Sequence, residues 1–192
     1  MNKVYGLISE YTEIREDRSR VIVAYNKIDE SDNKHATWNE IYFYKTQGIP
    51  TIDTIKKAII DEIDDKTVDT ITSGLVWNGI NVWLSTENQF NYKAAYDLAV
   101  QTNGSILPIT FKLGEDAEGN AIYHTFESME EFGDFSATVL SFIQTTLAAG
   151  WNKKDNFDFT PYEEWLDNRH DNITEETSKE TSEETDTENK EE

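Results

Sequence analysis

The chain has 192 residues, of which 37% are hydrophobic and 29% are charged, so it can form about one domain with a modest core. It contains no cysteine, which excludes disulfides, zinc–thiolate sites and cysteine nucleophiles. Its formal net charge of −21 argues against binding to nucleic acid or to an anionic membrane, because such surfaces attract clustered Lys and Arg.

Residues 1–49 are predicted to form an N-terminal domain of β-strands. Hydrophobic and aromatic residues concentrate in Lys3–Ser9, Arg20–Ile28 and Trp38–Tyr44, and polar or charged segments separate these runs. The second run alternates in the period of a β-strand. Three strands joined by polar turns predict an antiparallel β meander.

A second domain is predicted over residues 50–166, and it begins with a helix. Thr51 is a suitable N-cap for that helix. Isoleucines follow at helical spacing, at Ile52, Ile55, Ile59 and Ile63. We expect the helix to end near Asp65.

Residues 73–84 carry the clearest local signal in the chain. Asn78-Gly79 separates two apolar runs, and both residues accept the positive φ angles that a two-residue type I′ turn requires. The segment therefore predicts a β-hairpin, with Trp77 and Trp83 on its strands.

A helix is predicted from Ser85, and Asn103-Gly104 should end it, because glycine is a natural C-terminal stop. Its apolar residues form two neighbouring rows, one of Phe90, Ala94 and Leu98 and the other of Tyr92, Tyr96 and Ala99. A second hairpin is predicted to pair Ile106–Leu113 with Ala121–Phe126 across a turn-rich segment.

Ser128 and Glu131 have the spacing of a capping box, in which each side chain satisfies a backbone N–H at the start of a helix. The helix behind them should be closed by Gly150. Pro161 then begins a last short helix, with Tyr162 and Trp165 facing inward.

This order of elements predicts an α+β fold. The N-terminal antiparallel β meander is followed by a hairpin–helix–hairpin–helix core. Residues 167–192 are almost entirely Glu, Asp, Thr, Ser, Asn and Lys, and a segment of this composition cannot bury enough surface to order itself. We therefore expect a disordered acidic C-terminal tail.

The sequence favours no catalytic chemistry, so we predict that the protein is not an enzyme and uses no metal or cofactor. HExxH, Walker A, GxGxxG and GxSxG motifs are absent. None of His35, His124 and His170 has metal-ligand spacing with another histidine. Glu131 is better explained as a cap partner than as half of a catalytic carboxylate pair.

One segment is a candidate interaction surface. Asn88, Gln89, Asn91 and Tyr92 bring amides and an aromatic ring together near the start of the predicted helix. These amides could present hydrogen bonds to a protein partner. The alternative is a structural use, in which Ser85 or Thr86 caps the helix and the amides occupy its first exposed turn.

The segment from Ser73 to Tyr92 resembles the DUF4376 domain, a family of tailed phages and prophages whose function is uncharacterised. The similarity extends from Thr51 to about Leu166, a little over half of the chain. It carries no catalytic motif, and it does not cover the N-terminal strands or the acidic tail. The resemblance implies a structural or assembly role in phage tails or virions.

Three functional hypotheses remain open from the sequence. The first is a non-enzymatic tail- or virion-associated protein that binds other phage structural proteins, made in the host cytoplasm during assembly. The second is an acidic inhibitor or DNA mimic acting on a host protein, suggested by the net charge. The third is a carbohydrate-binding or hydrolysing module that uses exposed aromatic residues. Homo-oligomerisation and retention in the mature particle stay open.

Overall fold

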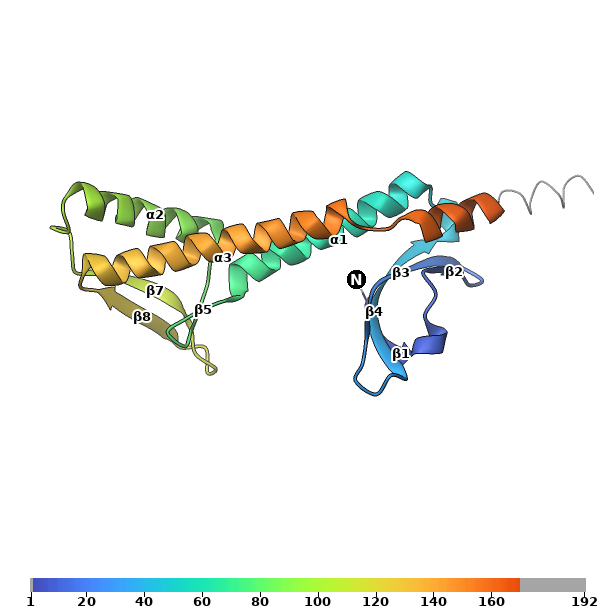
Figure 1. Cartoon of the computed structure of the whole chain (residues 1–192), viewed down its shortest axis with the longest axis horizontal. Coiled ribbons are helices and arrows are strands. Elements are labelled where there is room, and N and C mark those ends of the chain that lie inside the picture. The colour runs from blue at the N-terminus through green and yellow to red at the C-terminus, as the bar shows by residue number, and fades with distance from the viewer. Residues whose placement is uncertain (1, 170–192) are drawn as a thin grey trace, which may run out of the picture. The chain divides into compact units, whose positions relative to one another are not determined.

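The computed structural model describes residues 2–169, and within them the chain forms two compact units. The boundaries fall between Asp61 and Glu62 and between Asn156 and Phe157. The second unit is the continuous segment Glu62–Asn156, whereas the first combines the segments on its two sides. Figure 1 labels the helices and strands of both units. The predicted α+β class is confirmed.

A four-stranded antiparallel sheet dominates the first unit. Its strands are β1 (Asn2–Leu7), β2 (Ile14–Glu16), β3 (Arg20–Asp29) and β4 (His35–Tyr44), in the order β1-β4-β3-β2. The predicted antiparallel strands are present, but the order is not a simple meander. The strands β2, β3 and β4 are neighbours in sequence, while β1 crosses over to pair with the far side of β4. The short strand β2 lies in a segment that the sequence suggests is a connection.

Residues 21–25 of strand β3 are buried on both faces of the sheet. Val21 and Val23 are fully buried. On the other face Ala24 packs in a cluster with Ala36 and Trp38 of β4. Two short 3-10 turns, Ile8–Glu10 and Lys45–Gln47, follow β1 and β4.

Helix α1 spans Ile52–Ser73, so it extends eight residues past the predicted end at Asp65. Ile55 and Ile59 are fully buried, and Ile71 near its end is buried too, which gives the last turns a packing role. The hydroxyls of these turns donate to carbonyls four residues earlier, as the Oγ1 of Thr67 does to the Ile63 oxygen at 2.7 Å. Burial therefore outweighs the low helix propensity of a Thr-rich segment.

Two hairpins form the β part of the second unit. The first joins β5 (Leu75–Trp77) to β6 (Ile80–Val82). Asn78 and Gly79 both have positive φ angles, 47° and 78°, so the predicted type I′ turn is confirmed. The second joins β7 (Ile109–Glu115) to β8 (Ala121–Phe126), with a bulge before Gly114.

Helix α2 spans Thr86–Gln101 and α3 spans Met129–Asp155. The predicted stop at Asn103-Gly104 is confirmed, since both residues have positive φ after the helix has ended. The predicted stop at Gly150 is wrong, because α3 continues through it. A Cβ at Gly150 would lie 2.5 Å from the Oγ1 of Thr67 in α1. This glycine therefore allows close contact between two helices.

Aromatic rings fill the core of the second unit. Rings from the hairpins and from both helices lie with centroids 4.7–6.2 Å apart, mostly edge to face or tilted, which is the favourable geometry for such contacts. The contributors are Trp77, Tyr92, Tyr96, Phe111, Phe126, Phe132 and Phe135. This core fixes both helices against both hairpins.

The compact units differ from the domains that the sequence predicts at 1–49 and 50–166. A helix over residues 160–169 belongs to the first unit, because the Tyr162 hydroxyl donates to the carbonyl of Ala24 in β3 at 2.7 Å. Of the predicted tail at 167–192, residues 167–169 continue this helix. The remainder lies outside the described residues.

Candidate functional site

The amides predicted to form an interaction surface are used mainly to hold the start of α2. Ser85 caps the helix by accepting a hydrogen bond from the Asn88 backbone N–H at 3.2 Å. The Asn88 side chain donates to the Trp83 carbonyl at 2.9 Å, and Gln89 donates to the Leu84 carbonyl at 2.7 Å. Both amides therefore secure the chain that enters the helix.

Tyr92 is not a surface residue. Its side chain is buried in the aromatic core, and its hydroxyl donates to the Lys112 carbonyl at 3.3 Å. Burial raises the pKa of this hydroxyl above its ordinary value. Asn91 alone of the four predicted residues is exposed. The predicted surface is therefore not brought together as a unit.

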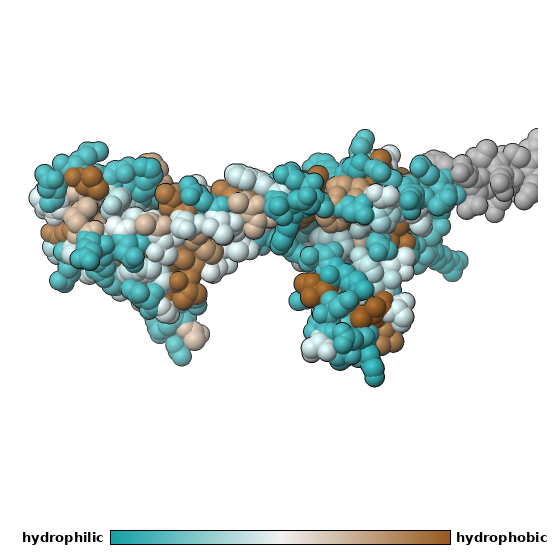
Figure 2. All heavy atoms as spheres, in the orientation of Figure 1, coloured by the Kyte–Doolittle hydropathy of each residue, from teal (hydrophilic) through white to brown (hydrophobic). Residues whose placement is uncertain are grey.

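The exposed face of α2 lies on the row that contains Phe90 and Leu98. Phe90 is 70% exposed, and Leu98 is also exposed. The neighbouring row, with Tyr92 and Ala99, faces the core. The sequence shows both rows but cannot tell which one is buried. On the face shown in Figure 2, hydrophobic side chains interrupt a largely hydrophilic surface.

An apolar groove of about 580 Å³ lies between α2 and α3, and we call it the α2–α3 groove. Its lining includes Tyr92, Tyr96, Ser136, Val139, Leu140 and Ile143. Leu140 is 57% exposed at its rim, and the Lys93–Asp97 ion pair separates the groove from the hollow beside Phe90. The buried Oγ of Ser136 has no hydrogen-bond partner among the described residues. The accessible surface that the groove offers is mainly apolar.

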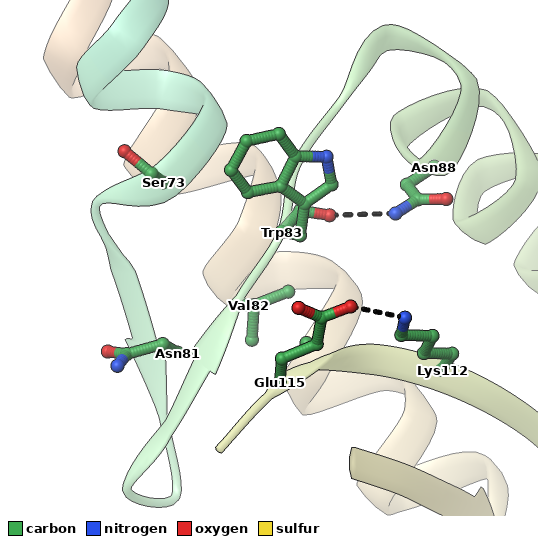
Figure 3. Close-up of a pocket in the computed structure, with 8 residues that line it drawn as sticks. Ser73, Asn81, Val82, Trp83, Asn88, Lys112 and Glu115 are labelled. Atoms are coloured by element: carbon green, nitrogen blue, oxygen red, sulfur yellow. Dashed lines mark hydrogen bonds and ion pairs between the residues drawn. The ribbon is translucent and has the colours of Figure 1, made fainter. Parts of the chain in front are cut away.

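A second concavity, of about 600 Å³, is more polar, and we call it the Trp83 groove. Ser73, Asn81, Trp83, Asn88, Lys112 and Glu115 line it (Figure 3). The indole lies between Ser73 and Asn88, while Lys112 and Glu115 lie on the opposite side as an ion pair at 2.7 Å. The sequence expectation for Trp83 is a place on a strand, but it follows the end of β6.

His124 and Glu131 form an acid–base pair in the second unit. The His124 Nε2 lies 2.9 Å from a carboxylate oxygen of Glu131, and its ring contacts Trp77 and Phe126. Ser128 caps α3 as predicted, accepting from the Glu131 N–H at 3.2 Å. The Glu131 side chain, however, is directed to His124. The pair ties β8 to the first turn of α3.

The first unit holds a buried carboxylate, Glu40, which is 3% exposed. Burial opposes its ionisation, but hydrogen bonds from Trp38, Arg15 and Tyr42, at 2.8–2.9 Å, together hold its pKa below the ordinary value. One guanidinium nitrogen of Arg15 remains buried without a partner in this part of the chain. The cluster pins β2 to the central strands, which is a structural use of charge.

Among residues 2–169, no group of three or more His, Cys, Asp or Glu side chains is arranged to hold a metal ion. No helix in the same part of the chain has the length and apolar character needed to cross a membrane. His35 lies on β4 beside Asp32, and His170 lies outside the described residues. The two grooves are therefore the candidate sites that the geometry provides.

Comparison with known proteins adds no assignment. No protein-family model, no curated protein and no solved structure matches this chain.

Proposed function

We propose that the protein is a non-enzymatic component of tailed-phage particles or of their assembly, and that it binds other structural proteins through the α2–α3 groove. The observation that carries this proposal is the exposed apolar surface formed by Leu140 at the rim of that groove and by Phe90 and Leu98 along the neighbouring hollow. Clustered exposed apolar side chains beside a groove typically mark protein-interaction sites. The resemblance of residues 73–92 to the DUF4376 family supports the phage context.

The proposed occupant is an apolar segment of another virion protein, flanked by basic residues. The groove has a volume of about 580 Å³ and a mainly apolar lining, and an amphipathic helix binds such a groove by inserting its apolar side chains. The chain carries a net charge of −21, so basic flanks on the partner would be attracted to it.

The proposal assigns no reaction to the chain. The His124–Glu131 pair connects β8 to α3, and the Glu40 cluster connects strands of the first sheet. The His124–Glu131 pair and the Glu40 cluster therefore both have a structural explanation.

The first test is mass spectrometry of purified phage particles from a host that carries this gene. We expect peptides of the chain at a fixed copy number, or in assembly intermediates that precede the particle. Phe90→Asp with Leu140→Asp should reduce incorporation by about tenfold or more, because a charge in an apolar contact costs binding energy. Val68→Asp is the matched control, since Val68 is exposed on α1 and lines neither groove.

Abundant protein in infected lysate, with none in particles or intermediates, would contradict the virion proposal. An acidic inhibitor of a host protein would then be the better explanation. If that alternative holds, the protein should no longer inhibit its host target when carboxylates of the two described units are replaced by amides.

A further inference from the structure

The Trp83 groove is not explained by the proposed protein contact, because it has a different lining and shares no residue with the exposed row of α2. Its centre is a tryptophan whose side chain is 52% exposed. Exposing an indole to water forfeits the stabilisation that burial of a large aromatic ring provides. Trp77, on the first strand of the same hairpin, is buried. The exposed ring is therefore accessible to a ligand that could stack on it.

The structure holds the backbone of Trp83 from both sides. Its N–H donates to the Leu113 carbonyl at 2.8 Å, and its carbonyl accepts from Asn88 at 2.9 Å. The next residue is fixed too, because the Leu84 N–H donates to the Thr72 carbonyl at 2.7 Å. The backbone that carries the indole is therefore fixed before a ligand binds, so binding costs little backbone entropy in the protein.

The wall of the groove is also fixed. Gly114, at the bulge of β7, lies so close to β6 that a Cβ there would be 2.1 Å from the Asn81 carbonyl oxygen. This contact brings β7 against the first hairpin. It places the Lys112–Glu115 pair across the groove from the indole (Figure 3).

We propose that the Trp83 groove is a binding site for a neutral oligosaccharide. The C–H face of a sugar ring carries partial positive charge and is attracted to the negative face of the indole. A sugar hydroxyl both donates and accepts hydrogen bonds, so adjacent hydroxyls can pair with the Glu115 carboxylate and the Lys112 ammonium together. The volume of about 600 Å³ is in the usual range for small-molecule sites.

Charge selects a neutral ligand over an anionic one. The Lys112 ammonium is already neutralised by Glu115, and the chain carries a net charge of −21. A nucleotide could stack on the indole, but its phosphates would meet this negative field. An apolar peptide would bury more surface in the α2–α3 groove. The site proposed here does not rest on the proposed virion contact.

The test is binding of the full-length chain to a glycan array, followed by fluorescence titration with cellotetraose, maltotetraose and chitotetraose. We expect at least one of these neutral probes to bind and to change the tryptophan emission. Trp83→Ala should weaken binding by about tenfold or more, while Trp83→Tyr should keep most of it, because a ring remains for stacking. A sulfated tetrasaccharide derived from heparin should not bind.

Trp151→Ala is the matched control, because Trp151 is 56% exposed on α3 and does not line the groove. This variant should bind like the unmodified chain, and circular dichroism should show that every variant is folded. The proposal is overturned if no neutral glycan binds, if only the sulfated probe binds, or if Trp83→Ala binds as well as Trp151→Ala. The Phe90→Asp and Leu140→Asp variants should bind the sugar normally, so failure of either proposal can be recognised separately.

Discussion

At the scale of single residues, Glu40 shows how a buried charge is maintained. Three donors, the Trp38 indole, the Arg15 guanidinium and the Tyr42 hydroxyl, bind its two oxygens. Because these bonds outweigh the cost of burial, the pKa of Glu40 is lower in the folded protein than in the unfolded chain. The stabilisation is therefore present above the unfolded-state pKa, about 4.3, and is lost as pH falls through the folded-state pKa.

Glu40→Gln tests this account. The variant should lose about 1–3 kcal/mol of unfolding free energy at pH 7. The reason is that the buried donors around residue 40 lose their charged acceptor, and the neutral amide satisfies them less well. Below the unfolded-state pKa the difference between the two proteins should shrink, since Glu40 becomes protonated in the parent chain. Urea unfolding of both proteins, from pH 7 to below the unfolded-state pKa, measures the stability difference and its decrease at low pH. An undiminished difference at low pH would contradict the assigned ionisation.

Residue-scale signals in the sequence are dependable where the cause is local. Asn78-Gly79 predicts its turn because positive φ is a property of those two residues themselves. Ser85 and Ser128 likewise cap the helices that they precede. Tyr92 could not be assigned in this way, because its burial depends on which side of α2 meets the hairpins. The exposure of Trp83, which lies between β6 and α2, likewise depends on tertiary packing and not on local sequence.

At the scale of elements, Gly150 shows why a correct signal can lead to a wrong helix end. A glycine after an apolar stripe is typical of a helix stop, but the same residue also permits close packing of two helices. Thr67 of α1 occupies the space that a side chain at Gly150 would need. The sequence contains no sign of this contact, since the two residues are far apart in the chain.

We predict that Gly150→Ala destabilises the protein by about 1–3 kcal/mol, because the new Cβ would overlap Thr67. The energetic cost of this overlap exceeds the stabilisation that alanine gives through its higher helix propensity. Gly133→Ala in the same helix is the control. There the nearest atom, the Tyr96 hydroxyl, would be 3.4 Å from the new Cβ, so the substitution should be neutral or stabilising by up to about 1 kcal/mol. Equal effects of the two substitutions in urea unfolding would show that the helix contact is not close.

At the scale of the whole molecule, the first unit is completed by a segment distant in sequence. Periodicity identifies the strands and the helix beginning near Pro161, but it does not state which core that helix joins. Tyr162 decides this, because it is buried and its hydroxyl bonds to the carbonyl of Ala24 in β3. Phe157 adds a ring contact to Tyr25 at a centroid distance of 6.4 Å. Long-range closure of this kind leaves no local sequence pattern.

Tyr162→Ala is therefore expected to destabilise the first unit selectively. Removing a fully buried ring and its hydrogen bond should cost about 3–5 kcal/mol, and hydrogen exchange should show lost protection in β3 and β4. Protection in β7 and β8 should change little, because those strands pack on the separate aromatic core of the second unit. Phe126→Ala provides the reciprocal case, since Phe126 is fully buried in that core. Equal loss of protection in both units after either substitution would mean that they unfold as one cooperative structure, and the division near Asp61 and Asn156 would then have no energetic meaning.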